Sequence, residues 1–223
     1  DGLSPLGKEL VREANRLGLL LDGSHAADTV VRDMMALSTT PIILSHTGAT
    51  AIYDHPRNIG DDLLLELAEN GGVIQMNIFG GYLEQLVPSP ERQAALEVLN
   101  EEYGSNPAEM DEATLAAWFA ARQELNAEFP APRSTYEKFM EHTYHVLDLI
   151  GPDHVGISGD WDGGGGVDGM SDVSMLQKVT RDLLDAGYTR DDVVKIWGGN
   201  MMRLVKAAEE GRESPLLSPN VLN

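Results

Sequence analysis

Two histidines follow short apolar runs near the start of the chain. His25 comes three residues after the run that ends at Asp22, and His46 closes the stretch "PIILSH". Neutral imidazole is a good ligand for zinc and similar ions, so two rings at neighbouring strand ends would converge on one cation. A lone histidine in such a place more often hydrogen-bonds locally, but the repeat on two successive runs favours a metal site. A catalytic zinc has about three protein ligands, so the others would come from Asp22, from Asp160 or from residues outside this chain.

Two further charged side chains suit the same chemistry. Asp160 ends the stretch "HVGISGD", and a carboxylate at a strand end beside a metal can take a proton from water and return it to a leaving group. The run Gly163–Gly166 that follows is typical of a flexible turn, since the Lys and the Ser or Thr of a phosphate-binding loop are absent. Arg57, in the loop after His46, is either an ordinary surface residue or, because its guanidinium is planar, a clamp for a substrate carboxylate.

Alternating strands and helices would position these groups. The predicted strands are Leu19–Asp22, Pro41–Ser45, Val73–Asn77 and His154–Asp160. The predicted helices run from about Pro5 to Leu17, from 27 to 38, from 60 to 72, from 134 to 151, from about Ser171 to Asp185 and from Arg190 to Glu210. Such alternation predicts an α/β fold with a parallel sheet and outer helices, either doubly wound or a barrel, with the site at the carboxyl ends of the strands. Four strands are too few to close an eight-stranded barrel.

Residues Glu84 to about Arg133 interrupt the alternation. This stretch is rich in Glu, Ala and Leu with scattered prolines, which predicts two helices inserted between barrel units rather than a separate domain. We therefore expect one partial-barrel domain over residues 1–210, insertion included, and a loose tail over 211–223. The first helix should present one apolar face, formed by Leu6, Leu10, Val11 and Ala14.

The bulk composition argues against several classes of protein. The 223 residues are enough for one domain with a sizeable core. A net charge of −20, from 36 acidic and 16 basic residues, disfavours nucleic acid and anionic membranes as partners and suits small substrates or cations. With no cysteine the chain has no disulfide and no thiolate chemistry, and its compartment stays open between the cytoplasm and the periplasm or exterior. No apolar run reaches roughly 18 residues, so we expect no membrane span.

Taken together, the motifs resemble the renal, or membrane, dipeptidase family of zinc metallopeptidases, within the amidohydrolase-like barrels. The similar blocks stand in the family's order and cover nearly the whole chain outside the insertion. They are "GLSPLGKELVREANRLG", "LLDGSH", "PIILSHTGA", "DHPRNIGDDLLLELAENGGVIQMN", "HVGISGDWDG" and "GGNMMRL". As a set these blocks are specific to the family.

The resemblance implies a two-metal (β/α)8-barrel enzyme that hydrolyses dipeptides. The family's barrels hold two bridged zinc ions, which polarise the scissile carbonyl and present a bridging hydroxide. By matching positions, His25 and His46 would ligate the second ion, Arg57 would hold the C-terminal carboxylate of the substrate, and Tyr82 would face the pocket. Asp160 would contact the substrate and transfer the proton.

The sequence departs from the family pattern in two places. Gly23 stands where many relatives carry a larger apolar residue. The family's His-x-Asp pair on the first strand, bridging glutamate on the third and substrate-contacting histidine on the fourth have no counterpart here. The chain thus resembles the C-terminal half of a TIM-type barrel, strands five to eight, without the N-terminal half that would complete it. The remaining histidines are expected to be structural or exposed: His55, His142, His145 and His154.

Three functional hypotheses stay open on sequence grounds. The first is a zinc-dependent dipeptidase of which this chain is the C-terminal part. The second is a non-catalytic binding or assembly half that keeps the metal-ligating histidines. The third is an amidohydrolase that acts on another small carboxylate-bearing amide or lactam. A His-x-Asp pair and a bridging glutamate upstream of Asp1 would favour the enzyme, and the acidic surface and inserted helices are compatible with a homodimer.

Overall fold

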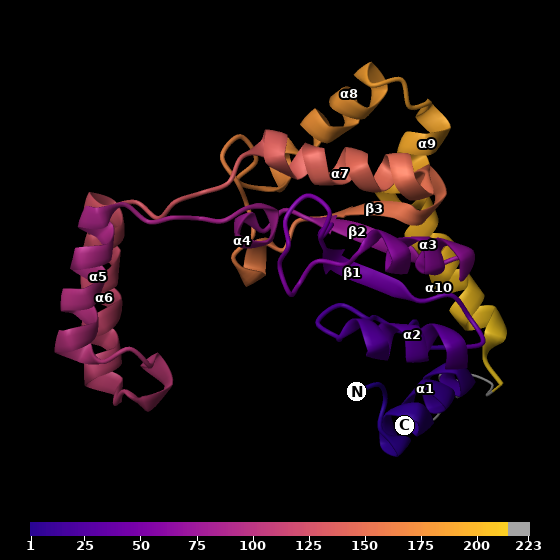
Figure 1. Cartoon of the computed structure of the whole chain (residues 1–223), viewed down its shortest axis with the longest axis horizontal. Helices are drawn as coiled ribbons and strands as arrows, with labels where there is room; N and C mark the ends of the chain where they lie inside the picture. Colours follow the sequence, from indigo (N-terminus) through magenta and orange to yellow (C-terminus); the bar gives the residue numbers. More distant parts are fainter. Residues whose placement is uncertain (214–223) are drawn as a thin grey trace, which may run out of the picture.

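Three parallel strands form the centre of the computed structural model, which describes residues 1–213 (Figure 1). They lie side by side in the order β1-β2-β3, with the bounds β1 Ile43–Thr47, β2 Val73–Asn77 and β3 Val155–Ser158. Parallel strands need a crossover connection, and accordingly α3 joins β1 to β2 while the segment from α4 to α7 joins β2 to β3. The α/β class and the parallel sheet predicted from the sequence are confirmed.

Helices make up most of the remaining chain. The α-helices are α1 Pro5–Leu17, α2 Asp28–Leu37, α3 Asp61–Glu69, α4 Gly80–Leu83, α5 Pro90–Tyr103, α6 Glu112–Glu128, α7 Tyr136–Ile150, α8 Gln177–Asp185, α9 Arg190–Val194 and α10 Asn200–Gly211. Short 3₁₀ turns are η1 Pro107–Glu109, η2 Pro152–His154, η3 Trp161–Gly163 and η4 Val173–Met175, and η5 Lys195–Gly199 is π-helical. The helix predicted from Arg190 to Glu210 is confirmed, since α9, η5 and α10 follow one another without a gap and η5 is a π-helical turn within that helical segment.

Side-chain caps explain why several predicted helices begin where they do. Ser4 accepts a hydrogen bond from the Gly7 amide at the start of α1, and Thr135 accepts one from the Lys138 amide at the start of α7. Such caps satisfy backbone amides that have no partner within the helix. At the other end of α1, Gly18 adopts a left-handed conformation with φ 76°, which a residue with a side chain rarely takes.

The first predicted strand, Leu19–Asp22, is reduced to a single bridge between Asp22 and Ile43. Two backbone hydrogen bonds flank it. The Ile43 amide donates to Leu21 O at 2.9 Å, and the Gly23 amide donates to Ile43 O at 2.8 Å. The prediction of four full strands is therefore wrong for the described residues, because the chain turns away from β1 after one pairing.

The apolar face predicted for α1 is only half buried. Val11 and Ala14 pack into the core, whereas Leu6 and Leu10 are 73% and 63% exposed. Together with Leu17 and Leu19, these two exposed side chains line an apolar groove of about 480 Å³. We call this surface, formed by Leu6, Leu10, Leu17 and Leu19, the leucine groove.

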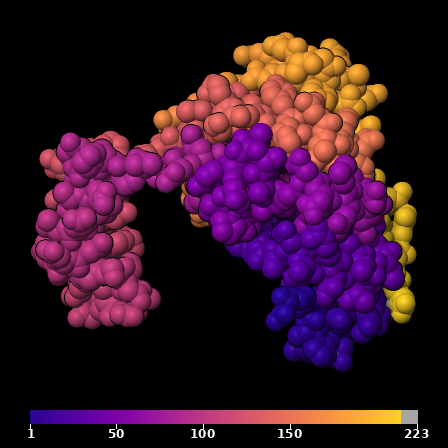
Figure 2. All heavy atoms as spheres, viewed as in Figure 1, coloured from indigo at the N-terminus to yellow at the C-terminus, as the bar shows by residue number. Residues whose placement is uncertain are grey.

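The insertion forms a helical arm that stands apart from the sheet. Figures 1 and 2 show α5 and α6 side by side, joined to the body by two extended segments. Arg92 fastens the two helices, because its guanidinium donates to Phe129 O and, at 2.8 Å, to Asn126 Oδ1. Val98 and Phe119 on the arm are exposed. The prediction of two inserted helices is confirmed.

The last described helix, α10, ends at Gly211. No helix within residues 1–213 is long and apolar enough to cross a membrane. The extent of the domain, predicted as residues 1–210, stays a prediction. Most of the tail predicted over 211–223 lies outside the described residues.

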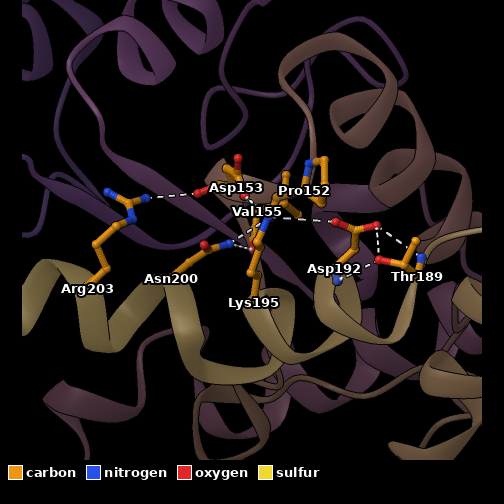
Figure 3. Close-up of polar contacts among 8 residues, drawn as sticks. All are labelled: Pro152, Asp153, Val155, Thr189, Asp192, Lys195, Asn200 and Arg203. Atoms are coloured by element: carbon orange, nitrogen blue, oxygen red, sulfur yellow. Dashed lines mark hydrogen bonds and ion pairs between the residues drawn. The ribbon is translucent and has the colours of Figure 1, made fainter.

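Polar contacts fasten the last helices to the start of β3 (Figure 3). The Asn200 side-chain amide, which is 3% exposed, donates to Pro152 O at 2.7 Å and to Val155 O at 2.8 Å. Lys195 forms an ion pair with Asp153 at 2.6 Å. Asn200 thus donates hydrogen bonds to two backbone carbonyls where β3 begins. These bonds hold the start of β3 against α10.

We expect Asn200→Ala to lower the free energy of unfolding by about 1–3 kcal/mol, because two carbonyl acceptors lose their buried donor. Urea denaturation measures the change. The matched control is Asn100→Ala on the exposed surface of α5. Equal stability of the two variants would contradict the role assigned to Asn200.

Candidate metal and substrate site

His25 and His46 meet at the carboxyl end of the sheet. His46 lies on β1, His25 lies in the loop after the bridge at Asp22, and their Nε2 atoms are 2.8 Å apart. The two ring centroids are 4.8 Å apart. Two tetrahedral zinc ligands with bonds of about 2.0–2.1 Å would place their nitrogens roughly 3.3 Å apart. A small opening of this pair would therefore admit one ion between the two rings.

The backbone is held in a rare conformation at two of the predicted site residues. Among residues 1–213, the non-glycine residues with positive φ are His25, at 68°, and Asp160, at 49°. The left-handed region costs an ordinary residue about 1–2 kcal/mol, and such strained residues cluster at functional sites. The positive φ angles are independent of the sequence motifs, and they single out two residues, His25 and Asp160, that the motifs also select.

Asp22, Ser24 and Ser45 form a hydrogen-bonded support beneath the imidazoles. The Asp22 carboxylate accepts the Ser45 hydroxyl at 2.5 Å, and the Ser45 hydroxyl oxygen lies 2.8 Å from His46 Nδ1. Partial desolvation would raise the pKa of Asp22, but the hydrogen bonds from Ser45 and Ser24 outweigh it and the pKa is lowered. The sequence analysis assigned no role to either serine, although the signal, a serine directly before each histidine, was present.

The pKa of His46 is affected by its burial and by the charged residues of the site. Burial lowers its pKa; Asp160 opposes that change, while the positive charges of Arg57 and His25 lower the pKa further. The lowered pKa favours the neutral imidazole at neutral pH, which is the form that binds a metal.

Arg57 sits between β1 and the aromatic ring of Tyr82. Its Nη2 donates to His46 O at 3.3 Å, its guanidinium carbon lies 5.1 Å from the centre of the Tyr82 ring, and its buried Nε has no partner among the described residues. Asn58 anchors this arrangement, because its side-chain amide donates to Tyr82 O at 2.7 Å. The guanidinium thus keeps donors available for an anionic group, and Tyr82 backs it with an aromatic face.

Asp160 is oriented by a buried amide from the neighbouring strand. Asn77, at the end of β2 and 1% exposed, donates from Nδ2 to Asp160 Oδ2 at 3.1 Å. Its Oδ1 is buried and has no partner among the described residues. The sequence analysis noted Asn77 only as a strand end, so this contact was missed. A polar side chain at the end of a strand was the available signal.

The donor set fits part of a zinc site. Two imidazoles are suitable zinc ligands, but residues 1–213 contain no group of three or more His, Asp or Glu side chains placed to share an ion. Asp22 and Asp160, the candidates for further ligands, therefore do not complete the pair. A cavity of about 20 Å³ lies beside His25 and Arg57, whereas a larger one of about 750 Å³, lined by Tyr144 among others, lies between α7 and the α8–α9 segment, away from these residues.

The other histidines have structural partners. His142 is fully buried, accepts from the Ala49 amide at Nδ1 and donates from Nε2 to Leu83 O. His145 pairs with Asp61 at 2.8 Å, and His154 donates to a backbone carbonyl. His55 packs between the rings of Tyr53 and Tyr82. These contacts agree with the expectation that the four histidines outside the site are structural or exposed.

Known proteins match the chain over almost its full length. Residues 1–218 fit the family model described as membrane dipeptidase, peptidase family M19. This chain belongs to the membrane dipeptidase family. The resemblance read from its motifs is therefore confirmed.

Curated relatives are longer than this chain. A dipeptidase of Schizosaccharomyces pombe, itself uncharacterized, is 28% identical over 211 residues, and dipeptidase aclJ of Aspergillus oryzae is 30% identical over 209 residues. The aligned regions cover 94% and 93% of this chain but only 41% and 39% of those relatives. The chain thus spans about two fifths of their length.

Solved structures agree in fold with the same partial coverage. The probable dipeptidase PvdM from Pseudomonas aeruginosa is 32% identical with a TM-score of 0.73, over 94% of this chain and 55% of that one. A metallo peptidase from Rhodobacter sphaeroides, solved with a phosphinate mimic of the dipeptide L-Ala-D-Ala, is 26% identical with a TM-score of 0.66, over 93% and 48%.

We predict that replacing both His25 and His46 by alanine abolishes stoichiometric zinc retention, because each supplies one of the paired nitrogens. Metal analysis after dialysis against zinc-free buffer measures the retained ion. His154→Ala, which removes a histidine outside the site, is the control and should leave the zinc content unchanged. Zinc content that persists in the double variant would remove the pair from the metal site.

Proposed function

We propose that this chain is the C-terminal half of a zinc-dependent dipeptidase that hydrolyses the single peptide bond of dipeptides. The observation that carries the proposal is the pair of Nε2 atoms 2.8 Å apart, on His25 and His46, at the carboxyl end of a parallel sheet. Family membership and the dipeptidase names of the relatives support the reaction class. In this proposal the complete enzyme holds two zinc ions, of which these two histidines ligate one.

In such a reaction, different residues of this chain bind the substrate and transfer the proton. Zinc bound at the site would supply Lewis-acid polarisation of the scissile carbonyl and a more acidic water. Arg57 binds the substrate's terminal carboxylate through its planar guanidinium, and Tyr82 closes one wall of that subsite. Asp160, oriented by Asn77, takes the proton from the attacking water and delivers it to the leaving amine. Each of these groups lies at the carboxyl end of the sheet, in a loop that follows it or, for Tyr82, in the short helix α4 after β2.

Three observations support the proposal that the other half of a barrel completes the site. The donor set described here lacks a third metal ligand. The sheet has three strands, and among the described residues β3 pairs on one side only. The leucine groove on α1 leaves apolar surface in water, which a packed neighbour would cover. On this proposal residues 1–210, with the helical arm, form one partial-barrel domain.

The remaining hypotheses make different use of the same residues. A non-catalytic assembly half would keep the histidine pair but would have no need for Asn77 to orient Asp160. An amidohydrolase acting on another carboxylate-bearing amide or lactam would keep both the histidine pair and the contact between Asn77 and Asp160. The part-buried hydrogen bond between Asn77 and Asp160 favours a catalytic role over a purely structural one.

In the reconstituted enzyme, Arg57→Lys should lower kcat/KM for a dipeptide by the equivalent of about 1.5–3 kcal/mol, because the charge stays while the bidentate fork is lost. The corresponding dipeptide amide, which has no terminal carboxylate, should be a poor substrate of the parent and almost insensitive to the substitution. Steady-state kinetics on the two substrates make the comparison. Equal losses on the acid and the amide would place Arg57 outside the carboxylate subsite.

Residues 1–223 alone should show negligible dipeptidase activity, since the described residues place no third His, Asp or Glu side chain where it could share an ion with the proposed ligands His25 and His46. Activity should return when the missing half of the barrel and zinc are supplied. Hydrolysis of a simple dipeptide is the assay, and Asp160→Asn controls for a contaminating peptidase. Turnover by the isolated chain that disappears in Asp160→Asn would show that this half builds a complete site by itself.

A further inference from the structure

We propose that Asp22 and Ser45 are positioning residues that form a hydrogen-bond relay and fix His46 in the tautomer whose Nε2 is free to bind a metal. The expected effect of these residues on zinc binding rests on the proposed function. The tautomer of His46 depends only on the side chains of Asp22, Ser45 and His46, and it can be measured separately.

The Asp22 carboxylate determines where the Ser45 hydrogen points. Oδ1 accepts from the backbone amides of Ser24, at 2.9 Å, and Ser45, at 3.1 Å. Oδ2 accepts from the Ser45 hydroxyl at 2.5 Å. An ionised carboxylate has no hydrogen to donate, and a hydroxyl has only one. The hydrogen of Ser45 therefore lies on the side of Asp22.

It follows that Ser45 Oγ faces His46 as an acceptor. His46 Nδ1 lies 2.8 Å from Ser45 Oγ, so the ring hydrogen must be on Nδ1, and Nε2 keeps its lone pair. In the other tautomer two lone pairs would face each other at that distance. The lone pair of His46 Nε2 is directed at the ring of His25, where the proposed ion would be shared.

The relay also links the two segments that carry the histidines. Ser24 directly precedes His25, and its hydroxyl oxygen accepts from the His46 amide at 3.0 Å and lies 3.5 Å from Ser45 Oγ. Asp22 reaches from the same loop to Ser45 on β1. These hydrogen bonds therefore hold the two segments that carry the imidazoles side by side as well as fixing one tautomer.

Nitrogen-15 NMR of histidine-labelled protein reads the tautomer directly, and the chain has only 6 histidines to assign. In zinc-free protein we expect His46 to be protonated at Nδ1. Asp22→Asn should reverse this, because the new amide group would donate to Ser45 Oγ and leave the Ser45 hydroxyl free to donate to His46 Nδ1. Protonation of His46 at Nε2 in the parent, or an unchanged tautomer in a folded Asp22→Asn variant, would overturn the relay.

Zinc affinity provides the second readout. Ser45→Ala should bind zinc about 10–100-fold more weakly, the usual effect of removing a hydrogen-bond partner of a metal-bound histidine. Ser45→Thr, which keeps the hydroxyl, should restore the affinity, and Ser105→Ala on the exposed arm is the matched control. Affinity in Ser45→Ala equal to that of the control would contradict the proposal. If the parent itself binds no zinc, the proposed function fails, while the tautomer measurement still decides the relay.

Discussion

The single pairing between Asp22 and Ile43 is the constraint on which the site depends. It brings the loop that carries His25 alongside β1, where His46 lies, although the loop contributes no full strand to the sheet. Parallel pairing of β1, β2 and β3 then brings Asn77 and the loop to Asp160 to the same end of the sheet. Residues far apart in the sequence thus meet because parallel strands end on one side.

The site is held by fixed geometry rather than by a deep pocket. His25 and Asp160 adopt left-handed backbone conformations, and each belongs to a segment secured by hydrogen bonds from its neighbours. Local strain of this kind persists only where the surrounding structure imposes it. This geometry stands in a chain that belongs to the membrane dipeptidase family and spans about two fifths of its curated relatives.

Periodicity and motif order predicted most of the fold and singled out the residues of the candidate site. The strands at Val73–Asn77 and near Val155 and the inserted helices follow from local sequence patterns. The structure brings His25 and His46 together as expected, and their role as metal ligands stays a prediction. The reduction of the first strand to one bridge could not be predicted from the sequence. The run of leucines before Asp22 gives no signal of where the pairing with β1 stops. The support from Ser45 was also missed, since a serine acquires a role only when a carboxylate from another segment reaches it.

On the proposed function, His25 and His46 share a zinc ion through their Nε2 atoms. Zinc-edge anomalous diffraction from crystals of the chain assembled with the rest of its barrel tests this directly. We expect an anomalous peak about 2.0–2.1 Å from both Nε2 atoms. A peak bound by only one of these imidazoles would contradict the shared site, and a peak bound by Nδ1 of His46 would also contradict the relay that orients that ring.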